Sequence, residues 1–156
     1  MRDAFLSRAR AAQKRTSMRE EHAMAKIEFS SPDGEPFRRT GDFVPDDFAA
    51  KLSPGELDSE VRFHHPGSAD RLQMFEIRAP ADAAFNAHSH DEDEIILVVE
   101  GELHAGSQVL GPGGSMYVTG GTVYAFRAGP EGLRFFNFRP RLDATYHSRA
   151  ESRASQ

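Results

Sequence analysis

The residues with the clearest chemical potential lie close together near the middle of the chain. His88 and His90 are separated by one residue, so on a β-strand both imidazoles project from the same face. Glu94 follows the acidic turn 91–93, where an antiparallel neighbouring strand can bring its carboxylate to the same place. Two neutral nitrogens and one carboxylate on one face form a facial triad that holds a metal ion and leaves coordination positions open. The spacing predicts a metal site of His88, His90 and Glu94.

Short strands are needed to position these side chains, and strand signals recur along most of the chain. Breaks rich in Gly and Pro separate them, and no helix-length segment lies between them, which excludes a parallel α/β fold. We therefore expect an all-β fold, an antiparallel sandwich or barrel. The expected strands are 60–64, 71–78, 85–90, 94–99, 102–105, 108–110, 116–118, 122–127 and 133–139.

The histidine segment resembles the first motif of the cupin superfamily, G-x5-H-x-H-x3-E-x6-G. His88, His90, Glu94 and Gly101 match four of its five fixed positions, and Asp82 stands where the first glycine is usual. The resemblance implies a small antiparallel β-barrel, a double-stranded β-helix or jelly roll, with a metal in its mouth. Activities in such families range over dioxygenases, isomerases, lyases, decarboxylases and non-catalytic binders.

The second cupin motif, G-x5-P-x-G-x2-H-x3-N, is matched only in part. Gly113 and Gly121 agree with it, Thr119 replaces the proline and Ala128 replaces the asparagine. Tyr124 takes the place of the metal-binding histidine. This is the departure with the largest chemical consequence, because a neutral phenol with a pKa near 10 is a poor metal ligand.

Tyr124 has two functional interpretations. In the one we favour, the metal keeps three protein ligands, and the phenol acts as a general acid or base or as a hydrogen-bond donor to substrate. In the other, Tyr124 coordinates as a phenolate, which favours a ferric-like or otherwise hard ion. The structural alternative is packing in the barrel, with the hydroxyl bonded to backbone.

Strand parity predicts further pocket residues. Asn86 shares the face of His88, and Phe126 shares the face of Tyr124. Many phenylalanines and no tryptophan indicate a largely apolar cavity that suits a small organic molecule. The sequence leaves open which face of two neighbouring strands lines the pocket. Strand 71–78 supplies either Met74 and Glu76 or Gln73 and Phe75. Strand 133–139 supplies either Phe135 and Asn137 or Phe136 and Phe138.

Other titratable groups favour plain surface roles. His104 is a candidate fourth ligand, but alternation from its apolar neighbours places it on the polar face. Of His64 and His65, adjacent on a strand, at most one can enter the pocket. The acidic run 91–93 is more typical of a solvated turn than of a second metal site.

Composition limits the classes of function. The chain has no cysteine, which excludes thiolate clusters, cysteine nucleophiles and disulfide scaffolds. Residues 1–26 carry seven Lys and Arg against three Asp and Glu, whereas residues 27–156 carry twelve against twenty-one. The acidic body leads us to expect no nucleic-acid partner. The longest apolar run, Ile95 to Val99, is too short to cross a membrane, and no signal-peptide pattern is present, so we expect a cytoplasmic protein without a membrane partner.

The chain of 156 residues suits one domain. The cupin resemblance covers about residues 70–140, the expected barrel core. We expect residues 1–26 to be a basic helical or disordered extension, residues 27–69 a turn-rich segment with short strands that pack on the barrel, and residues 141–156 a C-terminal tail.

We expect one divalent transition metal ion, Fe(II) first, with Mn, Ni, Zn or Cu as alternatives. The leading function is oxygenase-type chemistry on a small organic substrate. The alternatives are a metal-assisted lyase or isomerase that uses Tyr124 for proton transfer, and a non-catalytic binding or sensor module tethered by residues 1–26. We expect a homodimer, in which the same extension is a candidate exchange arm.

Overall fold

The computed structural model describes residues 27–149 and residue 151, so the expectations for residues 1–26 lie outside the described residues. The unit that begins at Ser31 carries the fold. It contains strands β1 (Arg38–Arg39), β2 (Glu60–His65), β3 (Gln73–Ala79), β4 (Ala84–Ser89), β5 (Glu94–Ala105), β6 (Gln108–Leu110), β7 (Ser115–Val118), β8 (Tyr124–Arg139) and β9 (His147–Ser148), and helices η1 (Thr40–Asp42), α2 (Asp46–Ala49) and α3 (Pro54–Asp58).

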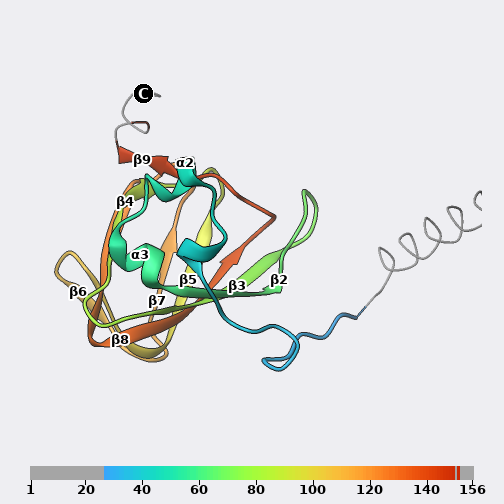
Figure 1. The fold of residues 1–156 in the computed structure, drawn as a ribbon, viewed down its shortest axis with the longest axis horizontal. Coiled ribbons are helices and arrows are strands. Elements are labelled where there is room, and N and C mark those ends of the chain that lie inside the picture. The colour runs from blue at the N-terminus through green and yellow to red at the C-terminus, as the bar shows by residue number, and fades with distance from the viewer. Residues whose placement is uncertain (1–26, 150, 152–156) are drawn as a thin grey trace, which may run out of the picture. The chain divides into compact units, whose positions relative to one another are not determined.

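The strands form one antiparallel sheet that curls into a half-barrel (Figure 1). Its main path runs β1-β2-β3-β8-β4-β9, and β5 pairs with β6, β7 and β8. The long strand β8 therefore holds the fold together, because it pairs with β3, β4 and β5 along its length. The all-β, antiparallel prediction is confirmed.

Two of the expected breaks are bulges within continuous strands. The Glu100–Gly101 break lies inside β5, and the break at 128–132 lies inside β8. Gly101 and Gly132 both have positive φ, +70° and +85°, and a Cβ on Gly101 would lie 2.0 Å from the Gly132 carbonyl oxygen. Only glycine permits this approach, which lets the two paired strands bend together instead of ending.

The concave side of the sheet holds the core. Its most deeply buried side chains include Ile96, Val98, Leu103 and Phe135. The register left open by the sequence is settled here, because Phe75 and Ile77 of β3 and Phe135 and Asn137 of β8 line the concave side. Glu76 and Phe136 are paired on the opposite, convex face.

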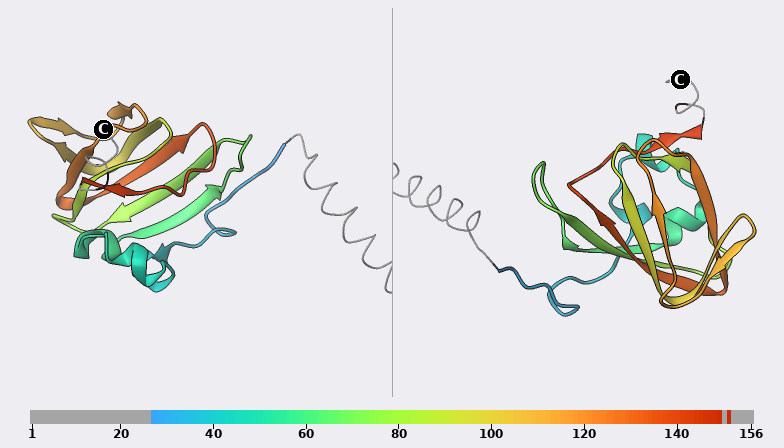
Figure 2. Two further views of the ribbon diagram at one scale, coloured as in Figure 1. Left: turned by 90° about the horizontal axis from the view of Figure 1, so that it is seen from above. Right: turned by 180° about the vertical axis from the view of Figure 1, so that it is seen from behind.

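Three short helices, η1, α2 and α3, occur in the segment where only turns and short strands were expected. Helix α3 begins with a capping box, in which the Ser53 hydroxyl accepts from the Glu56 amide and the Glu56 carboxylate accepts from the Ser53 amide. Helices α2 and α3 lie on the open, concave side of the sheet (Figure 2), where Phe48 of α2 and Glu56 of α3 line a pocket. No helix in the described part is long and apolar enough to cross a membrane.

Candidate metal and ligand site

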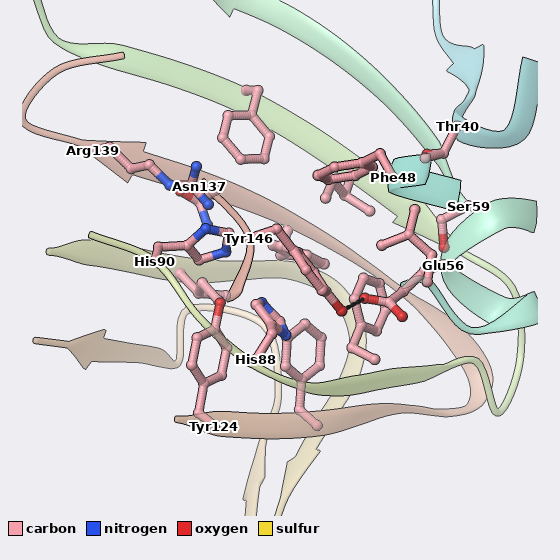
Figure 3. A pocket seen from close by; sticks show the side chains of 17 residues that line it. Thr40, Phe48, Glu56, Ser59, His88, His90, Tyr124, Asn137, Arg139 and Tyr146 are labelled. Atoms are coloured by element: carbon pink, nitrogen blue, oxygen red, sulfur yellow. Dashed lines mark hydrogen bonds between the residues drawn. The ribbon is translucent and has the colours of Figure 1, made fainter. Parts of the chain in front are cut away.

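A pocket opens on the concave side of the sheet, between the strands and helices α2 and α3. Its wall is mainly apolar, and a few polar side chains converge on one part of it (Figure 3). The lining residues with polar groups are Thr40, Glu56, Ser59, His88, His90, Tyr124, Asn137, Arg139 and Tyr146.

The two histidines of the motif both reach this pocket. Their ring centroids lie 4.8 Å apart. His88 Nδ1 lies 2.6 Å from the Asn86 carbonyl oxygen, and His90 Nδ1 is hydrogen-bonded to the Thr145 carbonyl oxygen. A carbonyl oxygen only accepts, so each Nδ1 carries a proton and each neutral ring keeps its lone pair on Nε2. Backbone carbonyls impose this same tautomer on histidines that bind metals.

Both imidazoles are neutral at pH 7. Burial lowers the pKa of His88. Burial and the nearby positive charge of Arg139 lower the pKa of His90 to about 4. A metal ligand must be unprotonated, so the pocket holds two nitrogen donors already in the required state.

The C-terminal segment fixes both rings, a role that no sequence pattern indicated. Tyr146 stacks on His88, with centroids 4.3 Å apart and an interplanar angle of 8°, and its hydroxyl donates to Glu56 Oε1 at 2.9 Å (Figure 3, dashed line). Strand β9 pairs with β4 at His88 and Ser89. Asp143 holds the start of the segment, because its carboxylate accepts from the Glu92 amide at 2.9 Å.

Glu94 is buried at the first position of β5, but all its contacts are with neighbouring side chains. Its Oε2 accepts from Asn137 Nδ2 at 2.7 Å and from Arg139 Nη2 and Nε at 3.0 and 3.2 Å. Its Oε1 accepts from the Tyr124 hydroxyl. Burial alone raises the pKa of Glu94, but the charge of Arg139 and these hydrogen bonds outweigh it and lower that pKa. Glu94 is thus an ionised carboxylate neutralised by Arg139.

Tyr124 lines the pocket, and its hydroxyl donates its proton to Glu94 Oε1. Burial raises its pKa well above the ordinary value, and the adjacent carboxylate of Glu94 raises it further. Phenolate formation is therefore unfavourable next to Glu94. The phenol oxygen keeps lone pairs that can accept a hydrogen bond from a ligand.

Of the three predicted ligands, the two histidines suit a divalent transition metal better than Glu94 does. The Nε2 atoms of His88 and His90 fit it in tautomer and charge. Glu94 has both carboxylate oxygens engaged, and among residues 27–149 and 151 no three His, Asp or Glu side chains form a group that could hold an ion. In this arrangement the two histidines are ready to bind an ion, whereas Glu94 has three hydrogen bonds on Oε2 and keeps a lone pair only on Oε1, beside the Tyr124 hydroxyl.

The other predicted residues differ in their positions. Phe126 lines the pocket beside Tyr124. Asn86 does not: its side chain is exposed and donates to the Lys51 carbonyl at 3.1 Å. A bulge between Phe85 and His88 explains this, because the extra residue breaks the alternation on which the parity argument rested.

The other titratable groups expected at the surface lie outside the pocket lining, and the His64 side chain is largely buried instead of exposed. His104 is partly exposed and lies 2.8 Å from Glu102. His64 faces the convex side, 3.0 Å from Glu76. In the acidic run, Asp91 contacts His147 and Glu92 contacts Arg141, so these carboxylates point to different partners.

No protein-family model matches the sequence, and no curated protein matches it. Solved structures do. An RmlC-like cupin from Ralstonia eutropha is 14% identical and has a TM-score of 0.61, with 86% of this chain and 87% of that one covered. The polyketide cyclase RemF from Streptomyces resistomycificus is 23% identical, with a TM-score of 0.53 and coverages of 62% and 75%. The DMSP lyase DddQ from Ruegeria pomeroyi is 18% identical, with a TM-score of 0.51 and coverages of 75% and 62%.

These similarities confirm the cupin fold that the His-x-His motif predicted. The neighbours differ in the chemistry that their names describe, so the shared fold does not select an activity.

Proposed function

We propose that this cupin binds a small, mainly apolar organic anion in its pocket, next to one divalent transition metal ion held by His88 and His90. The observation that carries the proposal is the pair of neutral imidazoles whose Nδ1 atoms are held by backbone carbonyls. Bound there, the metal would supply a Lewis acid and, if it is iron, a redox centre for dioxygen.

The ligand class follows from the lining and from the charges. The wall is built largely from phenylalanine, leucine and isoleucine side chains around a cavity of about 140 Å³, which suits a small apolar body. Glu94 and Arg139 neutralise one another, the histidines are neutral, and the pocket lining also contains the Glu56 carboxylate. A dication exceeds the charge of that one carboxylate, so an anionic ligand oxygen, such as a carboxylate or an enolate, best balances the remainder.

The pocket's own side chains would bind and shield the ligand. Tyr124 and Tyr146 donate their protons to Glu94 and Glu56, so toward the ligand they can only accept. Tyr146 and the α2 residue Phe48, whose rings meet edge to face at 5.4 Å, would keep water from the apolar part of the ligand. Arg139 would hold Glu94 ionised.

Metal content tests the proposal. The purified protein, its His88→Ala and His90→Ala variants, and a His104→Ala control are loaded with excess Zn²⁺ and then freed of unbound metal. We expect about one ion per chain in the wild type and in the control, and a large loss in both pocket variants. Equal metal content in all four proteins would refute it.

For the reaction we propose oxygenase-type chemistry first, because the two histidines leave open coordination positions. A metal-assisted elimination or cyclisation is the second candidate, and the lyase and cyclase among the structural neighbours favour it. Ligands are first found among small aromatic carboxylates and 1,3-diketones by their thermal stabilisation of the protein. Oxygen uptake by Fe(II)-loaded protein with such a ligand supports the first class; turnover with Zn(II) and no oxygen uptake supports the second.

A further inference from the structure

A buried amide on β8 lacks a partner for one of its two polar atoms. Asn137 is 3% exposed and lines the pocket. Its Nδ2 donates to Glu94 Oε2 at 2.7 Å, but its Oδ1 is buried and has no hydrogen-bond partner among the described residues. A buried acceptor without a partner destabilises the fold, so such an atom calls for a partner from outside the chain.

The orientation of this amide is fixed chemically. The carboxylate of Glu94 can only accept, so the edge of the amide that faces it must be the NH₂ group. Glu94 Oε2 also forms an ion pair with Arg139 Nη2 at 3.0 Å. The pair therefore acts as an anchor that turns Oδ1 away from Glu94, and Asn137 lines the same pocket as His90 (Figure 3).

Four polar atoms of the pocket lining offer lone pairs and no free proton. They are the Nε2 atoms of His88 and His90, the Oδ1 atom of Asn137 and the phenol oxygen of Tyr124, while the positive charge of Arg139 in the same lining is balanced by Glu94. Such a set attracts a cation, and the amide oxygen is a good donor to a divalent ion.

We infer that Asn137, through Oδ1, supplies the third donor of the metal site, and that Glu94 is its positioning residue instead of a ligand. The inference rests on the proposed metal function of His88 and His90. It departs from the ligand set that the sequence spacing predicted, since Glu94 and Asn137 exchange roles.

Co²⁺ binding, followed by visible absorption, tests the inference with Asn137→Ala and the control Gln108→Ala, which removes an exposed amide on β6. We expect affinity to fall about tenfold or more in Asn137→Ala and to stay unchanged in the control. If Glu94 were the ligand, Asn137→Ala would free its carboxylate, and affinity would stay the same or rise. That result would overturn the inference.

A second measurement needs no substitution. The chain has only two asparagines, Asn86 and Asn137, so labelling of asparagine with ¹³C and ¹⁵N gives two side-chain amides. Added Zn²⁺ should shift the Asn137 ¹³Cγ signal and leave that of the exposed Asn86 nearly in place. An unchanged Asn137 signal in protein that binds Zn²⁺ through its histidines overturns only the inference. A protein that binds no Zn²⁺, or whose binding survives His88→Ala and His90→Ala, overturns the proposed function as well.

Discussion

Tyr146 lies flat against His88, with an interplanar angle of 8° and 4.3 Å between ring centroids. The contact joins the C-terminal segment to the strand that carries the histidine motif. Together with the Thr145 carbonyl on His90 Nδ1, it means that one segment, far away in sequence, orients both imidazoles. The C-terminal segment with Thr145 and Tyr146 thus completes a site whose histidines lie on the sheet.

Tyr146→Ala should lower the free energy of unfolding by about 3 kcal/mol, because it removes the stack on His88, the edge contact with Phe48 and the hydrogen bond to Glu56. Tyr146→Phe keeps the ring contacts and should cost about 1 kcal/mol. Urea unfolding measures both. Tyr117→Ala, at a tyrosine that is 60% exposed, is the control, and a Tyr146→Ala loss no larger than the control's would contradict this role.

Arg139→Met leaves the buried carboxylate of Glu94 without its counter-charge. We expect a loss of about 3–5 kcal/mol in unfolding free energy. The double variant Glu94→Gln/Arg139→Met removes both charges and should be more stable than Arg139→Met alone. Arg127→Met changes an exposed arginine of the same strand and should cost little. A double variant that is less stable than Arg139→Met would show that the charge of Glu94 is neutralised elsewhere.

The convex face contains a second buried carboxylate, and it predicts a pH dependence. Glu76 Oε2 accepts from Arg62 at 2.6 Å and contacts His64, while Oε1 accepts from Arg134 at 2.7 Å. Burial raises the pKa of Glu76, but these hydrogen bonds outweigh it and lower the pKa to about 2. The folded state therefore binds this proton less readily than the unfolded state does, and stability is lost as the pH falls from about 4.5 toward 2.

Glu76→Gln removes that dependence. The difference in unfolding free energy between wild type and variant should shrink from pH 5 to pH 3, as measured by urea unfolding at both values. Glu60→Gln, at a partly exposed carboxylate paired with Arg78, serves as the control. A difference that stays constant with pH would mean that Glu76 is not held ionised by its partners.

The bend shared by β5 and β8 predicts an unequal cost for two glycines. Both Gly101 and Gly106 have positive φ, but a Cβ on Gly106 meets nothing within 4 Å. Gly106→Ala should cost about 1 kcal/mol from the backbone alone. Gly101→Ala should cost roughly 1–3 kcal/mol more, because its Cβ would meet the Gly132 carbonyl. Equal thermal unfolding of the two variants would contradict the close approach.

The features that the sequence predicted well are local ones. Strand periodicity and the spacing of the motif depend on neighbouring residues, and both indicated the fold correctly. Even the departure at Asp82 has a local explanation. Asp82 has a φ of 57° and is the one described residue other than glycine with positive φ. Glycine adopts this conformation most easily and aspartate tolerates it.

The features that sequence reasoning missed depend on contacts between distant segments. The partners of Glu94 lie 30 to 45 positions further along the chain, and Tyr146 is 90 positions from Glu56. A bulge, which shifts the register by one residue, moved Asn86 out of the pocket. The homodimer and the cytoplasmic location stay predictions from sequence.

The most direct test of the central claim counts the imidazoles on the bound ion. Pulsed electron paramagnetic resonance of the Cu²⁺-loaded wild type should detect two coordinated histidine rings, and His88→Ala and His90→Ala should each reduce the count to one. His104→Ala should leave it at two. A spectrum without coordinated imidazole, or one that neither pocket variant changes, would contradict the account.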